Sequence, residues 1–107
     1  MLKIYEDAKM MCGDAGRVAR AIERRDSDLA RQLRRAATSV LLNLAEGDGV
    51  TGGHRRQRYM TAMGSAREVL ACFDAAEAMR YVAEVDGDVR RRLDVIIGTL
   101  VRVVRPA

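Results

Sequence analysis

The sequence predicts an all-α protein, an antiparallel up-down-up-down four-helix bundle formed by a single domain over residues 1–107. Apolar residues recur at a spacing of three or four through most of the chain, which is the pattern of helices with one buried face. The only proline is Pro106, so no proline interrupts these segments. Hydrophobic residues make up 49% of the chain, yet they include only three tyrosines, one phenylalanine and no tryptophan. A core of such small aliphatic side chains suits closely packed helices.

The first two helices are expected over residues 2–25 and 27–46. Asp26 or Ser27 can cap the second helix, because either side chain can accept a hydrogen bond from a free backbone N–H. Gly47 is expected to end it, since glycine enters the left-handed backbone region without a Cβ penalty. The expected inner faces are Tyr5, Ala8, Cys12, Ala15, Ala19 and Ile22, followed by Leu29, Leu33, Ala36 or Ala37, Val40 and Leu44.

The third and fourth helices are expected over residues 53–82 and 86–105. The glycine-rich stretch 47–53 between the second and third helices has no preceding strand and no Gly-Lys-Ser/Thr, so it is interpreted as an interhelical turn and not as a phosphate loop. Short loops make consecutive helices antiparallel neighbours. The expected inner faces are Tyr59, Met63, Ala66, Leu70, Phe73 and Ala76, followed by Val89, Leu93, Ile96, Leu100 and Val103.

Cysteine usage and hydropathy favour a cytoplasmic protein. Cys12 and Cys72 are far apart and form no Cys-x-x-Cys pair, so two buried, reduced thiols are expected in place of a disulfide or a zinc site. The N-terminal residues carry charges throughout and lack the apolar stretch of a signal peptide. No apolar run approaches the ~20 residues of a membrane span. We therefore expect no membrane partner.

Arginine dominates the charge. The net charge is +4, and all but two of the 19 basic residues are arginine. An ordinary set of solvated helix faces in an arginine-rich proteome would explain this composition, and so would a surface for phosphate backbones. Cations at the start of the third helix are unfavourable for that helix, so acids from a neighbour or an anionic ligand should compensate them. The candidate nucleic-acid-binding residues are Arg17, Arg20, Arg24, Arg31, Arg34, His54, Arg55, Arg56 and Arg58.

A second set of polar residues follows the inner side of the second and third helices. In antiparallel neighbours, Arg35 can lie near Glu68 and form a bidentate ion pair, so we expect a buried pair there. A network of this kind fixes helix register, and we favour that interpretation over direct ligand binding. The expected structural polar network is Gln32, Arg35, Ser39, Asn43, Glu46, Ser65 and Glu68.

The stretches from Gln32 to Gly47 and from Ala62 to Glu68 carry the ordered pattern Gln-x-x-Arg-Ala, Ser-x-x-x-Asn-x-x-Glu-Gly and Gly-Ser-x-x-Glu. This pattern resembles the four-helix bundle family encoded in intervening sequences of bacterial large-subunit ribosomal RNA genes. The accessory variability determinant (Avd-like) proteins of diversity-generating retroelements are similar to that family. The match spans residues 29–81, and the segment 23–29 lacks the aromatic and proline residues that relatives often carry there. Residues at motif positions are Gln32, Arg35, Ala36, Ser39, Asn43, Glu46, Gly47, Gly64, Ser65 and Glu68.

The resemblance implies a subunit that assembles into a homo-oligomeric ring, typically a pentamer. It also implies association with RNA or DNA, a reverse transcriptase as a possible partner, and no enzymatic activity. The residues agree on the last point: no Glu-x-x-His pair for a metal site and no clear nucleophile beside His54 can be found, so neither cofactor nor metal is expected. A non-enzymatic nucleic-acid-binding adaptor is the favoured function. The alternatives are a purely structural or protein-binding oligomer and, less favoured, a small hydrolase or nuclease.

Overall fold

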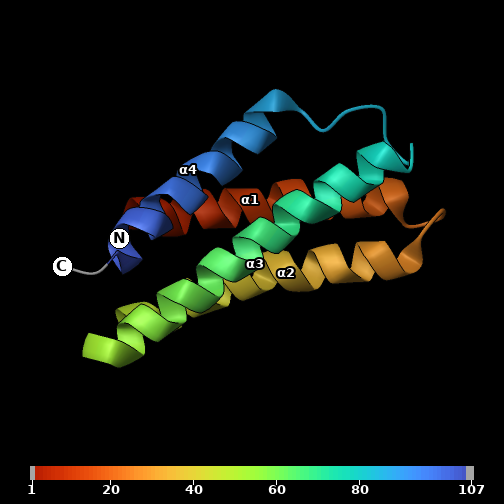
Figure 1. Cartoon of the computed structure of the whole chain (residues 1–107). Coiled ribbons are helices and arrows are strands. Elements are labelled where there is room, and N and C mark those ends of the chain that lie inside the picture. Colours follow the sequence, from red (N-terminus) through yellow and green to blue (C-terminus); the bar gives the residue numbers. More distant parts are fainter. Residues whose placement is uncertain (1, 106–107) are drawn as a thin grey trace.

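The computed structural model describes residues 2–105, and these form four helices: α1 (Leu2–Ile22), α2 (Ser27–Asp48), α3 (Gly52–Ala78) and α4 (Gly87–Val104). Figure 1 shows consecutive helices running in opposite directions, with α4 returning beside the start of α1. Each helix packs on the next along the chain and α4 closes on α1; α2 and α3 share the most extensive contact. The predicted all-α, up-down-up-down bundle is confirmed.

The α1–α2 connection, residues 23–26, is longer than the sequence predicts. Helix α1 ends at Ile22 and not near Arg25, because the backbone N–H groups of Arg25 and Asp26 both donate to Ile22 O, at 3.0 and 2.9 Å, and close a turn. Asp26 leaves the helical conformation and its carboxylate accepts a hydrogen bond from Leu29 N at 2.9 Å. Asp26 is therefore the N-cap of α2, as one of the two candidates predicted.

Gly47 does not end α2, which continues to Asp48, and the prediction of a left-handed Gly47 is wrong. The C-cap is Gly49, with right-handed φ of −90°. Gly47 is buried in the helix against Tyr59 of α3, and a Cβ atom on it would lie 2.4 Å from Tyr59 Cε1. Close approach of two helices, and not backbone freedom, therefore requires glycine at this position.

Helix α3 ends at Ala78, four residues before the predicted end near Val82. Arg80 N donates to Glu77 O at 3.0 Å and Tyr81 N donates to Ala76 O at 2.9 Å. These two bonds form a Schellman motif, which turns the chain out of the helix and places Arg80 in the left-handed region with φ of 62°. The glycine usual at this position is missing from the sequence, so the helix end was not predicted.

The core consists mainly of aliphatic side chains around the fully buried Phe73. In α1 the buried face runs through Ile4 and Met11, while Tyr5 and Cys12, which were predicted there, are only partly buried against it. In α4 the last core residue is Val104, and the predicted Val103 is 42% exposed. In the described part of the chain, no helix has the length and apolar character needed to cross a membrane.

Candidate functional site

The start of α3 lies against the C-terminal ends of α2 and α4, because neighbouring helices are antiparallel. Arg55 Nε donates to Gly47 O at 3.1 Å and to Val50 O at 2.9 Å. Arg56 Nε donates to Val104 O at 3.0 Å. Carbonyls at a helix C-terminus lack intrahelical partners and carry the negative end of the helix dipole. Both arginines thus satisfy helix ends, and we call this part of the molecule the Arg55 end.

Arg58, the third arginine of that cluster, forms an ion pair with Glu46 of α2 at 2.9 Å. Both side chains are about half exposed, so the pair is accessible to solvent. Glu46 was predicted as part of the polar network, but it lies outside that network and neutralises Arg58. His54 is exposed on the same first turn. The compensation expected for these cations thus comes from within the chain, by helix-end carbonyls and one carboxylate.

The arginines of α1 and α2 divide into paired and unpaired residues. Arg17 pairs with Asp14, and Arg31 pairs with Asp28. Arg34 pairs with Glu23 at 2.6 Å. Within residues 2–105, no acidic partner lies within ion-pair distance of Arg20 or Arg24, and both are exposed. Of the five candidates on these two helices and the turn between them, Arg20 and Arg24 therefore carry the uncompensated charge.

Sequence reasoning missed Asp14, the one charged residue that is buried in the described chain, at 4% exposure. Its two carboxylate oxygens accept hydrogen bonds from Arg17 of α1 and from Arg92 of α4. A buried carboxylate requires this compensation, and removing either partner would leave it poorly satisfied. The Asp14–Arg92 pair thus holds α4 on α1. In the sequence, Asp14 lies beside Ala15 on an otherwise apolar face of the helix, and this position could have indicated that it is buried.

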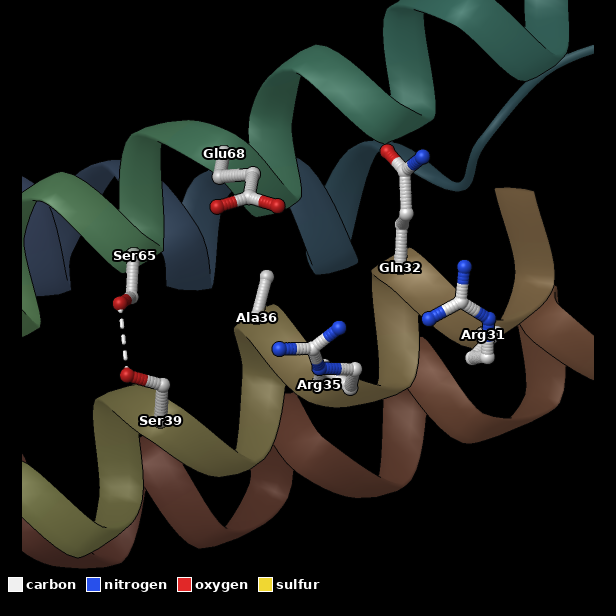
Figure 2. A pocket seen from close by; sticks show the side chains of 7 residues that line it. All are labelled: Arg31, Gln32, Arg35, Ala36, Ser39, Ser65 and Glu68. Carbon is white, nitrogen blue, oxygen red and sulfur yellow. Dashed lines mark hydrogen bonds between the residues drawn. The ribbon is translucent and has the colours of Figure 1, made fainter. Parts of the chain in front are cut away.

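The polar residues between α2 and α3 form a smaller network than predicted (Figure 2). Ser39 Oγ and Ser65 Oγ are 2.8 Å apart across the two helices. Asn43 Nδ2 donates to Ser39 O at 2.9 Å and to Ser39 Oγ at 3.2 Å. These three side chains link the helices at one level of the bundle. Gln32 donates to Asp28 at 3.2 Å on the exposed side of α2 and stands outside the network.

The expected buried ion pair between Arg35 and Glu68 is wrong. Both side chains are exposed, and among the residues described no ion pair joins them. In Figure 2, Ala36 points from α2 toward α3 and lies below Glu68, while the Arg35 side chain runs along the outside of α2. Adjacent helical residues point about 100° apart, so the buried Ala36 directs Arg35 toward solvent. Arg35 and Glu68 line an open cavity of about 400 Å³ together with Ser39 and Ser65.

The opposite end of the bundle, made by the α1–α2 turn and residues 79–86, has a different arrangement, and we call it the Arg80 end. Arg25 Nη1 donates to Arg80 O at 3.0 Å, and Tyr81 OH donates to Asp26 Oδ2 at 3.1 Å. A cavity of about 550 Å³ opens here. It is lined by Arg25, Glu77, Arg80, Tyr81, Val82 and Ala83. None of these residues could be predicted as a site residue, because only the folded chain brings residue 25 to residue 80.

The two cysteines are free thiols. Cys12 Sγ donates to Ala37 O at 3.2 Å, and Cys72 is buried in α3. Burial raises the pKa of both thiols, which keeps them protonated near neutral pH. Across residues 2–105, no group of three or more His, Cys, Asp or Glu side chains is placed to hold a metal ion.

Comparison with known proteins gives one result that covers nearly the whole chain. The family model of the 23S rRNA-intervening sequence protein matches residues 1–100. No curated protein and no solved structure shows a significant match. The family match extends beyond the motifs in α2 and α3 to include α1 and most of α4. The chain therefore belongs to the family of 23S rRNA-intervening sequence proteins.

Proposed function

We propose that this protein is a non-enzymatic, oligomeric adaptor that binds the phosphate backbone of RNA or DNA through exposed arginines. The observation that carries the proposal is a group of arginines without an acidic partner: Arg24, Arg25 and Arg80 at the Arg80 end, and Arg20 beside it in the last turn of α1. A cluster of uncompensated guanidinium groups attracts polyanions and releases counterions when it binds them. Membership of a family named for ribosomal RNA intervening sequences supports nucleic acid as the polyanion.

This placement moves the proposed surface away from the start of α3. Arg55 and Arg56 donate through Nε to helix-end carbonyls, and Arg58 is paired with Glu46. Replacing these three arginines would disturb helix ends as well as charge. Arg20 and Arg24 make no such contact in the described chain, so their replacement tests binding more cleanly.

The experiment compares two double variants with the same change in net charge. Arg20→Glu/Arg24→Glu removes charge at the Arg80 end, and Arg67→Glu/Arg102→Glu removes it from exposed positions of α3 and α4. Fluorescence anisotropy with labelled RNA and DNA at increasing salt should show at least a roughly tenfold loss of affinity and a shallower salt slope for the first variant. Equal losses in both variants, or no binding by the wild type at low salt, would overturn the proposal.

Oligomerisation strengthens the proposal physically, because a homopentameric ring repeats each modest arginine cluster and binds a polyanion by avidity. Light scattering of the wild type should give a mass several times the 11.9 kDa of one chain, and a monomer would contradict this part. A reverse transcriptase is proposed as a partner that such a ring could hold on its template. Co-purification of the two proteins after nuclease treatment tests a direct contact.

A purely structural or protein-binding oligomer is the second candidate, and one face favours it. On α2 and α3, Leu42 is 60% exposed, and Gly64 has no atom within 4 Å of an added Cβ. Arg35 and Glu68 are both exposed on the same face, with no ion pair in the described chain. A ring by light scattering, with no shift of any nucleic acid, would select this function. A screen with divalent metals should detect no hydrolase or nuclease activity in either case.

A further inference from the structure

Arg80 occupies a position that normally belongs to glycine. It is the residue after the C-cap in the Schellman motif of α3, and its φ of 62° is the one positive φ at a non-glycine residue in the described chain. A side chain in the left-handed region strains the backbone, and neither asparagine nor aspartate is used here to reduce that strain. Strain that the rest of the fold tolerates points to a use for the side chain itself.

The surroundings of Arg80 leave positive charge uncompensated. Arg25 Nη1 donates to Arg80 O at 3.0 Å, which brings the two arginines to the mouth of one cavity. The carboxylate of the cavity, Glu77, accepts from Val85 N at 2.7 Å and pairs with Arg90 at 2.9 Å. Those contacts lower the pKa of Glu77, and its negative charge is offset by Arg90 in place of Arg25 or Arg80. Arg25 and Arg80 therefore face the cavity without an opposing carboxylate of their own.

Tyr81 adds to this cavity an aromatic ring whose position is fixed by a hydrogen bond. Its hydroxyl donates to Asp26 Oδ2 at 3.1 Å, and the same Asp26 carboxylate caps α2 through Leu29 N. The ring is partly buried and contributes to the cavity wall beside Val82. A ring that is fixed at one edge and partly open loses little entropy when a flat ligand stacks on it.

We infer that this cavity is a subsite for one nucleotide of a single-stranded nucleic acid, with the phosphate between Arg25 and Arg80 and the base against Tyr81. Guanidinium groups bind phosphate through charge-assisted hydrogen bonds, and bases of any sequence stack on aromatic rings. The cavity volume of about 550 Å³ lies within the ~300–1,000 Å³ range of small-molecule sites. The inference rests on the proposed function and deepens it. The proposed function needs only contact with the phosphate backbone of the nucleic acid, whereas this site would also bind the base of an unpaired nucleotide.

A purely structural role for Arg80 makes the opposite prediction about stability. A cation at a helix C-terminus interacts favourably with the helix dipole, so a structural Arg80 would lose stability when replaced. Glycine at the same position removes the backbone strain and keeps the carbonyl that accepts from Arg25. Arg80→Gly should therefore melt at the wild-type temperature or a few degrees above it, while it loses binding.

The experiment measures affinity and melting temperature in parallel for Arg80→Gly, Arg80→Lys and Tyr81→Leu, with Arg67→Gln and Tyr5→Leu as matched controls. The probe is a labelled ten-nucleotide oligouridine, and a labelled RNA duplex serves for comparison. Arg80→Gly and Tyr81→Leu should each weaken oligouridine binding roughly tenfold, and duplex binding less. Arg80→Lys keeps the charge without the planar guanidinium and should lie between the wild type and Arg80→Gly. The two controls should bind as the wild type does.

The outcomes separate this inference from the proposed function. If the wild type binds nucleic acid and loses it in Arg20→Glu/Arg24→Glu but not in Arg80→Gly or Tyr81→Leu, the subsite is wrong and the adaptor function stands. If the wild type binds no nucleic acid at all, both are wrong. If Arg80→Gly melts below the wild type and also loses binding, the loss of binding is explained by loss of stability. Arg80 would then have a structural role, and the subsite would be wrong. Uridine monophosphate should compete with the oligouridine better than inorganic phosphate does, and equal competition would remove Tyr81 from the site.

Discussion

The two ends of the bundle use arginine in different ways. At the Arg55 end, Arg55 of α3 donates to Gly47 O and Val50 O at the end of α2, and Arg56 of α3 donates to Val104 O at the end of α4. At the Arg80 end, Arg25 makes one carbonyl contact, and Arg24 and Arg80, like Arg20 in the adjoining last turn of α1, have no acidic partner in the described chain. Both ends have similar numbers of arginines in the sequence, but they differ in how much charge is left for a ligand.

The difference shows that arginine density does not measure binding capacity. A guanidinium has five N–H donors, and a helix C-terminus offers up to four free carbonyls, so the two groups satisfy each other wherever the fold brings them together. The start of α3 lies against two such termini. The α1–α2 turn lies against the end of α3, where the Schellman motif has already satisfied the carbonyls of Ala76 and Glu77. There, one arginine side chain, Arg25, donates to a backbone carbonyl, that of Arg80.

The largest expected effect concerns the packing of the Arg55 end. Gly47→Ala places a Cβ 2.4 Å from the buried Tyr59 ring, so α2 and α3 must separate or the ring must move. We expect a loss of roughly 1–3 kcal/mol in the free energy of unfolding, measured by urea denaturation. Gly64→Ala is the matched control, because nothing lies within 4 Å of an added Cβ there and alanine favours the helix by up to ~1 kcal/mol. Equal stability of the two variants would show that Tyr59 does not constrain this end.

A smaller effect tests whether arginine holds the helix ends. Arg55→Leu removes the donor to Gly47 O and Val50 O and should cost roughly 1–2 kcal/mol in the free energy of unfolding. Arg58→Leu removes only a solvent-accessible ion pair with Glu46 and should cost less than ~1 kcal/mol. If Arg58→Leu is the more damaging change, the contrast between carbonyl-bound and surface-paired arginines fails.

The smallest expected effect appears only at alkaline pH. Burial, with the hydrogen bond to Asp48, raises the pKa of Tyr59 from an ordinary value of 10.0 to about 12. Between these values the unfolded chain loses the tyrosine proton while the folded chain keeps it, so the stabilisation is full below pH ~10 and is lost as pH rises to about 12. Tyr59→Phe should flatten that decline in chemical denaturation at several pH values. Some decline should remain, since the pKa of Tyr81 is also raised. An unchanged slope would place Tyr59 in a less buried environment.

Helix existence could be predicted because it depends on periodicity, and helix direction because short loops make consecutive helices antiparallel. Leu33, Leu44 and Phe73 lie in the core where the spacing of apolar residues placed them. Helix ends were less accurate, because they depend on which backbone groups close a turn. The sequence shows a glycine at residue 47 but not the tyrosine that packs on it, and it shows an arginine at residue 80 but not the left-handed backbone there.

The predicted polar network was correct in part, for a related reason. Ser39, Asn43 and Ser65 were expected in one polar network, and in the structure hydrogen bonds join their side chains, because a spacing of four on α2 and the antiparallel register bring them to one level. Arg35 and Glu68 have suitable spacing too, but a rotation of one residue around α2 places Ala36 between the helices. The register of a helix along its neighbour can be inferred from loop lengths, whereas its rotation depends on which side chains fill the interface.

The sequence by itself therefore determined the number, order and direction of the helices, most of their buried faces, and the excess of arginine. These properties follow from local spacing and composition, which the chain carries in any conformation. Only the tertiary structure decided which arginines donate hydrogen bonds to helix-end carbonyls and that Asp14 is buried between Arg17 and Arg92. It also decided that Arg25, Arg80 and Tyr81 line one cavity. Apart from the pair of Asp14 with Arg17, which lies within α1, each of these contacts joins atoms from separate helices or turns. The strength of such a contact depends on the desolvation and alignment that packing imposes.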